Sequence, residues 1–153
     1  PQDYNARANI MWCATLALNG LISAGVPQDW ATHMIGHEMT TLCGLDHART
    51  LAIVLPALWE IRSAEKKEKL LQYAERVWEI TAGDEQARID AAIARTREFF
   101  KSLQVGTRLC DYNLTEAIIP TIVERLKAHN MTKLGEKRDV TPELAEAILR
   151  QCL

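Results

Sequence analysis

The stretch Thr32–Trp59, THMIGHEMTTLCGLDHARTLAIVLPALW, holds three of the four histidines in this 153-residue chain. Its pattern predicts two helices joined by a sharp reversal. The first should run from about Gln28 to Leu42 and end at Gly44, because a glycine after the last apolar position is a common helix stop. The second should begin at His47, with Asp46 as its N-terminal cap. This pair of helices is the basis for the rest of the predicted fold.

Five further helices are expected where apolar residues recur every three or four positions between capping signals. The segment from Asn5 to Ser23 is apolar around most of its circumference, which is typical of a helix buried inside a domain. No segment alternates in the way that a half-buried strand requires. The predicted fold class is therefore all-α with about seven helices. The other four expected helices are Ala64 to Thr81, Glu85 to Ser102, Leu114 to His129 and Pro142 to Cys152.

Three local signals mark expected breaks or starts of helices. Pro56 should kink or restart the helix that begins at His47, because proline has no N–H and clashes with the preceding turn. Asn113 followed by Glu116 is a capping-box signature for a helix that starts at about residue 114. Thr141, directly before a proline, is expected to cap the last helix.

Composition narrows the class of protein. With 48% hydrophobic residues and a net charge of −2, the chain has enough apolar material for one globular domain. It lacks the basic surface that nucleic-acid binding needs, and no apolar run approaches the roughly 20 residues of a membrane span. We therefore expect neither a nucleic-acid nor a membrane partner. Four scattered cysteines and no secretory signal indicate reduced thiols in a cytoplasmic protein.

The histidine spacing suggests a metal site without defining it. His33 and His37 face the same way on one helix, with Cβ atoms roughly 6 Å apart, so spacing alone favours them as a chelating pair. On a straight helix His47 would lie about 21 Å from His33, so these two can share a metal only if the chain reverses between them. The alternative is that all three are ordinary polar residues of a helical interaction domain.

Other functional interpretations of the stretch are weaker. Glu38 follows His37, but position 41 is threonine, so the ligand pair of a zinc peptidase is missing. A self-contained metal-dependent hydrolase would need Glu38 as its general base. Cys43 is a minor candidate for contact with a metal. The stretch supplies too few ligands for an open catalytic site, which usually also has a carboxylate.

The opening stretch resembles the C-terminal part of the iron-containing alcohol dehydrogenase family. The preceding NARANIMWCATLALNGLISAGVPQDWA, the following KLLQYAERVWEIT and the tail HNMTKLGEKRDVTPELAEAIL share this resemblance. The similar branch contains NADPH-dependent aldehyde reductases and butanol dehydrogenases. One departure is Ala48, where many family members have glycine. The resemblance implies that residues 1–153 are the helical, metal-binding C-terminal domain of a dehydroquinate-synthase-like fold. The N-terminal dinucleotide-binding domain, with its glycine-rich phosphate turn, is absent from this chain.

The resemblance also implies a site and an activity. In that family one aspartate and three histidines hold a divalent metal, iron or zinc. Two of these histidines match His33 and His47, whereas His37 matches a histidine beside the metal and the nicotinamide. The other two ligands would precede Pro1. The implied enzyme interconverts aldehydes and primary alcohols by metal-assisted hydride transfer with NADP(H), which the missing domain mainly binds.

The remaining expectations follow from the same resemblance. His37 would relay a proton or orient the nicotinamide, and would thus be both a catalytic and a cofactor-binding residue. The expected partners are the chain's own N-terminal domain, a small aldehyde or alcohol, and a second copy in a homodimer. The isolated fragment is expected to be inactive.

Overall fold

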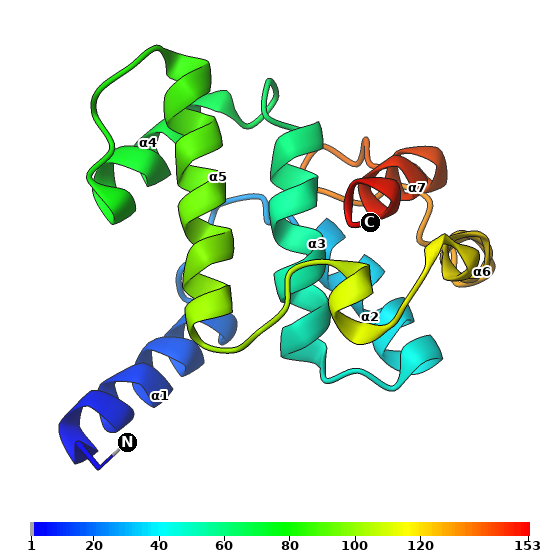
Figure 1. Ribbon diagram of the computed structural model, residues 1–153, viewed down its shortest axis with the longest axis horizontal. Helices are drawn as coiled ribbons and strands as arrows, with labels where there is room; N and C mark the ends of the chain where they lie inside the picture. Colours follow the sequence, from blue (N-terminus) through cyan, green and yellow to red (C-terminus); the bar gives the residue numbers. More distant parts are fainter. Residues whose placement is uncertain (1) are drawn as a thin grey trace.

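The computed structural model describes residues 2–153, and these form helices joined by turns (Figure 1). The extended pairing in this range is one isolated bridge between Leu134 and Val140. The all-α prediction is therefore confirmed. None of the described helices is long and apolar enough to cross a bilayer. In chain order the helices are α1 (Tyr4–Leu18), α2 (Ala31–Cys43), α3 (His47–Ile61), α4 (Lys67–Trp78), α5 (Glu85–Ser102), η1 (Leu109–Tyr112), η2 (Glu116–Ile118), α6 (Ile119–Ala128) and α7 (Pro142–Gln151), where η denotes a 3-10 helix.

Helix α3 is the centre of the fold. It packs against α2, α5 and α7, while α4 pairs with α5 on one side and α6 pairs with α7 on the other (Figure 1). The main core lies between α2, α3, α6 and α7, and all of its side chains come from these helices, their end caps and the segments that join them. A smaller cluster between α4 and α5 is joined to it by Trp59, which packs against both. Fully buried members of the main core include Ile35, Met39, Ile53, Leu58, Ile122, Leu126, Ile148 and Leu149.

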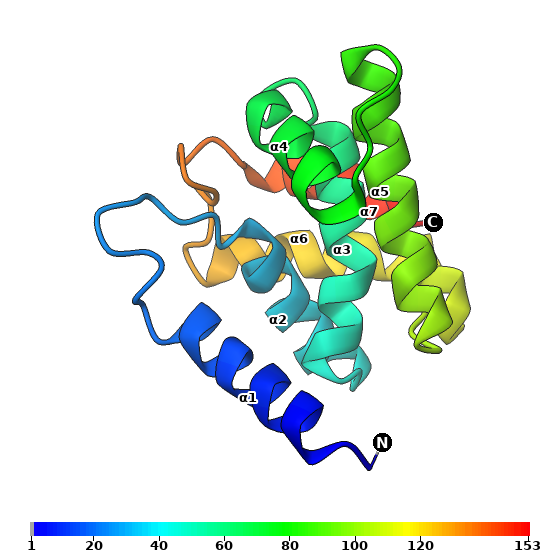
Figure 2. The same ribbon diagram turned by 90° about the vertical axis from the view of Figure 1, so that its left-hand side faces the viewer.

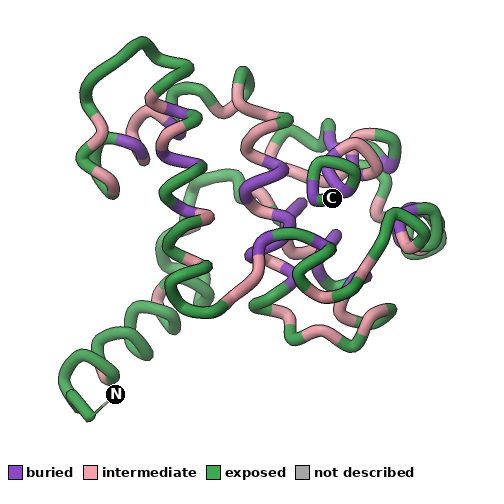
Figure 3. The backbone as a smooth tube through the Cα atoms, in the orientation of Figure 1, coloured by how far each residue is buried: buried purple, intermediate pink, exposed green. Residues whose placement is uncertain are grey.

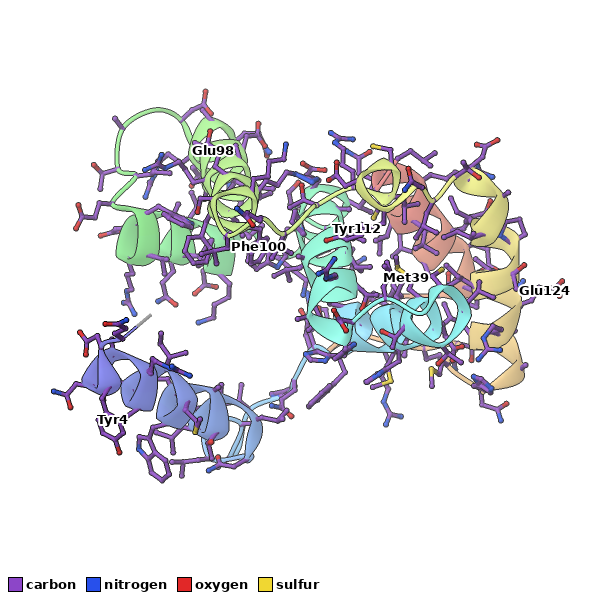
Figure 4. The ribbon with its side chains drawn as sticks, turned by 60° about the horizontal axis from the view of Figure 1, so that its bottom comes forward. Tyr4, Met39, Glu98, Phe100, Tyr112 and Glu124 are labelled. Atoms are coloured by element: carbon purple, nitrogen blue, oxygen red, sulfur yellow. The ribbon has the colours of Figure 1, made fainter. Side chains whose placement is uncertain are left out.

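Helix α1 projects from the rest of the chain and has no buried residue (Figures 2 and 3). Tyr4 and Trp12 are 81% and 62% exposed, and Tyr4 points away from the other helices in Figure 4. The expectation of a buried first helix is therefore wrong for the described residues. An apolar circumference indicates that a helix needs a cover, and residues 2–153 do not supply one. The helix also ends before Ser23, because Asn19 caps it and Gly20 takes a left-handed conformation at φ +89°.

The observed ends of the other helices match the capping residues predicted from the sequence only in part. Gly44 ends α2 at φ +68°, as predicted, and Thr141 accepts a hydrogen bond from the Leu144 amide at the start of α7. The capping box predicted at Asn113 is wrong. Asn113 is instead the left-handed residue, at φ +58°, that ends η1, and α6 begins later at Ile119. Asparagine suits both roles because its side chain can cap a helix and its backbone tolerates this conformation.

Helix α3 begins where the sequence predicts but differs in detail. Asp46 occupies the N-cap position, yet its side chain makes no capping hydrogen bond and pairs with Arg49 at 3.3 Å. The helix then continues through Pro56 to Ile61 instead of restarting. Pro56 is buried between core residues, so packing on both sides of the helix compensates for the backbone hydrogen bond that proline removes.

The close approach of α2 and α3 depends on Gly36, which is buried and faces α3. A Cβ atom at this position would lie 2.9 Å from Thr50 Oγ1 and 3.6 Å from His47 Cε1. The Thr50 hydroxyl has little freedom to move, because it donates a hydrogen bond of 2.8 Å to the His47 carbonyl oxygen. Glycine within a helix costs about 1 kcal/mol relative to alanine. The contact with α3 explains why it is needed here.

We expect Gly36→Ala to lower the free energy of unfolding by about 1–3 kcal/mol, because the added methyl must displace Thr50 in a packed interface. Chemical unfolding followed by circular dichroism measures this. Thr41→Ala, at an exposed position of the same helix, is the control and should change the free energy by less than about 0.5 kcal/mol. If Gly36→Ala were as stable as the original chain, Gly36 would not set the distance between α2 and α3.

Candidate metal centre

The reversal at Gly44 brings three histidines of α2 and α3 together. His33 Nδ1 lies 3.1 Å from His47 Nε2, although the residues are fourteen positions apart. The His37 ring stacks on the His47 ring, with centroids 4.2 Å apart and planes 7° from parallel. One ring nitrogen from each of the three lies within 4.8 Å of the others. Within residues 2–153 no other group of three or more histidines, cysteines or carboxylates comes so close, and Cys43 does not belong to this one.

The ring distances separate the two pairs that the sequence offered. The His33 and His37 centroids, which helical spacing favours as a chelating pair, are 6.3 Å apart. The centroids of His33 and His47 are 5.2 Å apart, and their nearest nitrogens are in contact. The chain reversal that a shared site for His33 and His47 requires is therefore present. The family resemblance matched this second pair to metal ligands.

Burial and repulsion between the rings favour the neutral form of the two facing imidazoles. Burial lowers the pKa of His33, and a charge on His37 would lower it further. Burial also lowers the pKa of His47, with additional contributions from His37 and His33. The neutral ring is the form whose nitrogen lone pair can bind a metal. His37 is exposed at the rim of the cluster.

The donor set fits a divalent cation. Imidazole nitrogens bind zinc at about 2.0–2.1 Å, so two ligands of one ion lie about 3 Å apart. The observed separation of 3.1 Å between His33 Nδ1 and His47 Nε2 meets this requirement. No carboxylate of the described residues joins the group. These histidines therefore fit part of a coordination shell for iron or zinc, both of which accept imidazole.

A mostly apolar cavity of about 290 Å³, with Gln28 and Asp29 also in its wall, lies beside His33 between the end of α1 and the start of α2. Its lining includes Leu18, Ile22, Val26 and Trp30. The Trp30 ring lies 4.9 Å from the His33 ring and is held in place by a 3.0 Å hydrogen bond from its Nε1 to the side chain of Gln28. The cavity can therefore receive an apolar group next to an imidazole.

A second cavity, of about 370 Å³, lies between α3 and α4, and no histidine lines it. Lys66, in its wall, is half-buried and pairs with Asp29 at 2.7 Å and with Glu136 at 2.8 Å. The Lys66 ammonium thus bridges two carboxylates, and the pairing joins three separate segments of the chain. This cavity therefore contributes to structure in a way that needs no ligand.

Glu38 is buried on the side of α2 that faces α6. Its Oε2 accepts a hydrogen bond from Arg125 Nε, and its Oε1 accepts one from His129 Nδ1, both at 2.6 Å. Burial raises the pKa of Glu38, but the hydrogen bonds from His129 and Arg125 outweigh it and hold the pKa below its usual value. Both carboxylate oxygens are engaged, which argues against Glu38 as the general base of a hydrolase.

Sequence reasoning missed Gly36, Thr50 and this ion pair. The only signal for Glu38 was a carboxylate on the apolar side of a helix, and its partners lie 87 and 91 positions away. Gly36 stands between His33 and His37 in the sequence, but its contact with Thr50 depends on how the two helices cross. A pattern along one helix does not contain that information.

The sequence model of the family described as Fe-containing alcohol dehydrogenase family, C-terminal, matches residues 1–153. The NADPH-dependent aldehyde reductase YqhD of Escherichia coli is 60% identical over 148 residues, which are 97% of this chain and 38% of that protein. NADH-dependent butanol dehydrogenase A of Clostridium acetobutylicum is 31% identical over 143 residues, 92% of this chain and 37% of that protein. The chain thus spans about two fifths of the length of these relatives.

Solved structures share the fold. The crystal structure of Escherichia coli YqhD matches with a TM-score of 0.98 at 58% identity, over 100% of this chain and 39% of that one. NADH-dependent butanol dehydrogenase A of Thermotoga maritima matches with a TM-score of 0.91 at 28% identity, over 99% of this chain and 40% of that one. The resemblance found in Thr32–Trp59 is therefore confirmed. From the match of its whole length and from its shared helical fold, the chain belongs to the iron-containing alcohol dehydrogenase family and corresponds to the C-terminal helical part of its members.

Proposed function

We propose that this chain is the metal-binding part of an NADP(H)-dependent enzyme that interconverts aldehydes and primary alcohols. The observation that carries the proposal is the 3.1 Å contact between His33 Nδ1 and His47 Nε2 in a member of this family. The 60% identity with an NADPH-dependent aldehyde reductase supports the choice of substrate and cofactor. The missing length would include the dinucleotide-binding domain that holds most of NADP(H).

In this proposal His33 and His47 are ligands of a divalent iron or zinc ion, and an aspartate and a further histidine come from the preceding part of the protein. A bound divalent cation supplies Lewis-acid polarisation of a carbonyl oxygen, and NADP(H) supplies or accepts the hydride. The two imidazoles hold their nitrogens at the spacing of a shared ion. The cavity beside His33 takes the alkyl part of a small aldehyde or alcohol.

His37 has a different proposed role, as a catalytic and cofactor-contacting residue. Its ring is stacked on His47 but is exposed, so it stands beside the site rather than in its interior. An exposed imidazole in this position can accept a proton from, or pass one to, a neighbouring group. It can also set the position of a flat cofactor ring that lies against it. If replacing His37 alters the pH dependence of kcat, its role is proton transfer. If the replacement alters KM for NADPH instead, its role is to position the cofactor.

The proposal extends to the surroundings of the enzyme. The apolar side chains exposed on α1 suit a surface covered by the rest of the protein or by a second subunit of a homodimer. All four cysteines are free thiols, which suits the reducing cytoplasm.

In the full-length protein, His33→Ala and His47→Ala should each remove bound metal and lower aldehyde reduction by about 100-fold or more, because each loses a direct ligand. Metal analysis and NADPH oxidation with butanal measure the two effects. His37→Ala is the matched histidine variant, and should keep its metal while kcat or KM for NADPH changes. Retention of metal by His47→Ala together with its loss from His37→Ala would instead support the pair favoured by spacing.

The 153-residue chain alone should show no aldehyde reduction with NADPH, because it lacks the proposed cofactor domain and half of the proposed ligands. It should also bind zinc more weakly than the full-length protein. Zinc titration and the same NADPH assay on both proteins test this. Turnover by the short chain would contradict the proposed division of the site between two domains.

The pH dependence of zinc binding follows from the lowered pKa values of His33 and His47. Each ring is neutral above its lowered pKa, so the proton competes with zinc only once the pH falls below the ordinary histidine value of about 6.5. The zinc affinity should stay level from mildly alkaline to neutral pH. It should fall at more acidic pH, by up to about 100-fold per pH unit, because two protons then compete. Competition with a chromophoric chelator measures it. If the zinc affinity already fell as the pH was lowered from alkaline values toward neutral, the ligand would be a different group, such as a thiol.

A further inference from the structure

Thr50 places a fully buried hydroxyl between the two helices that carry the histidines. Three polar atoms surround its Oγ1: the His47 carbonyl oxygen at 2.8 Å, Thr40 Oγ1 at 3.4 Å and His47 Nδ1 at 3.5 Å. The hydroxyl lies where a side chain at position 36 would otherwise project, and the lack of a Cβ on Gly36 leaves room for it.

The chemistry of these neighbours fixes the direction of the hydrogen bonds. A hydroxyl has one proton to donate and two lone pairs to accept with. A carbonyl oxygen can only accept, so the Thr50 proton lies in the shortest contact, toward the His47 carbonyl oxygen. Thr50 Oγ1 can therefore only accept from the His47 ring. That arrangement favours the tautomer of His47 with its proton on Nδ1 and a lone pair on Nε2.

We propose that Thr50 is a positioning residue that sets the tautomer of His47, so that Nε2 offers its lone pair toward His33. His47 Nε2 is the nitrogen that lies 3.1 Å from His33 Nδ1. A neutral imidazole without such a partner samples both tautomers, and one of them has a proton where a cation would bind. Histidines that bind metals usually donate their other ring N–H to a fixed acceptor. The consequence for metal binding rests on the function proposed above, whereas the tautomer itself does not.

Thr96 provides a matched comparison within the same chain. It is also buried on a helix, and its Oγ1 donates to the Ala92 carbonyl oxygen at 2.8 Å and contacts Tyr73 Oη at 2.8 Å. No histidine is among these hydrogen-bond partners. Thr96→Val therefore removes a buried helical hydroxyl of the same kind without touching the histidine cluster.

The test is the tautomer of His47 in the metal-free 153-residue chain, at mildly alkaline pH where the rings are neutral. Long-range proton–nitrogen spectra of nitrogen-15-labelled protein show which ring nitrogen carries the proton. The original chain, Thr50→Ser and Thr96→Val should have His47 protonated on Nδ1. Thr50→Val should shift the proton wholly or partly to Nε2, because Nδ1–H loses its acceptor. An unchanged tautomer in Thr50→Val would overturn the role of Thr50.

Zinc titration of the same variants is the second readout. Thr50→Val should weaken zinc binding by about 10-fold, whereas Thr50→Ser should stay within about threefold of the original chain. If the original chain and the full-length protein bind no zinc while Thr50→Val still changes the tautomer, the proposed metal centre is wrong and the role of Thr50 stands. If Thr50→Val does not fold, as judged by circular dichroism, Thr50→Ala removes the same hydroxyl and leaves more space beside Gly36.

Discussion

The close contact between α2 and α3 is the constraint on which both the core and the histidine cluster depend. Gly36 lets the two helices approach until the Thr50 hydroxyl lies only 2.9 Å from the place where a Cβ of residue 36 would stand. The same approach buries Ile35 and Met39 in the main core. A protein interior is close-packed, so the helices cannot separate without opening a gap. The 3.1 Å contact between the histidines is therefore maintained by packing, with no need for the rings to attract each other.

The opposite side of α2 is fixed by charge. Glu38 is almost fully buried, and Arg125 and His129 bond to its two oxygens from the region of α6. A buried ion pair often adds little net stability, because removing charges from water is costly, but breaking one is strongly unfavourable. It therefore disfavours rotations of α2 that would leave the carboxylate unpaired. The helix is held on one face by packing against α3 and on another by this ion pair, which together orient His33.

Sequence patterns predicted the parts of the fold that depend on neighbouring residues. Periodicity located the helices, and Gly44 marked the reversal that brings His33 and His47 together. Spacing along one helix favoured His37 over His47 as the partner of His33, because it cannot measure distances across a turn. The exposure of α1 could not be predicted for a related reason. The apolar residues of α1 predict that the helix is buried against another surface. They do not tell whether that surface belongs to the same 153 residues.

The incomplete features of this chain lie close together. The histidine group lacks a carboxylate among the described residues, the apolar cavity beside His33 lies at the end of α1, and α1 itself is uncovered. One additional surface placed against α1 and α2 could complete all three. Under the proposed function that surface belongs to the cofactor-binding domain, so the cation would bind donors from both parts of the protein. Metal binding and domain contact would then stabilise each other, since a ligand that bridges two parts favours the state in which they are joined.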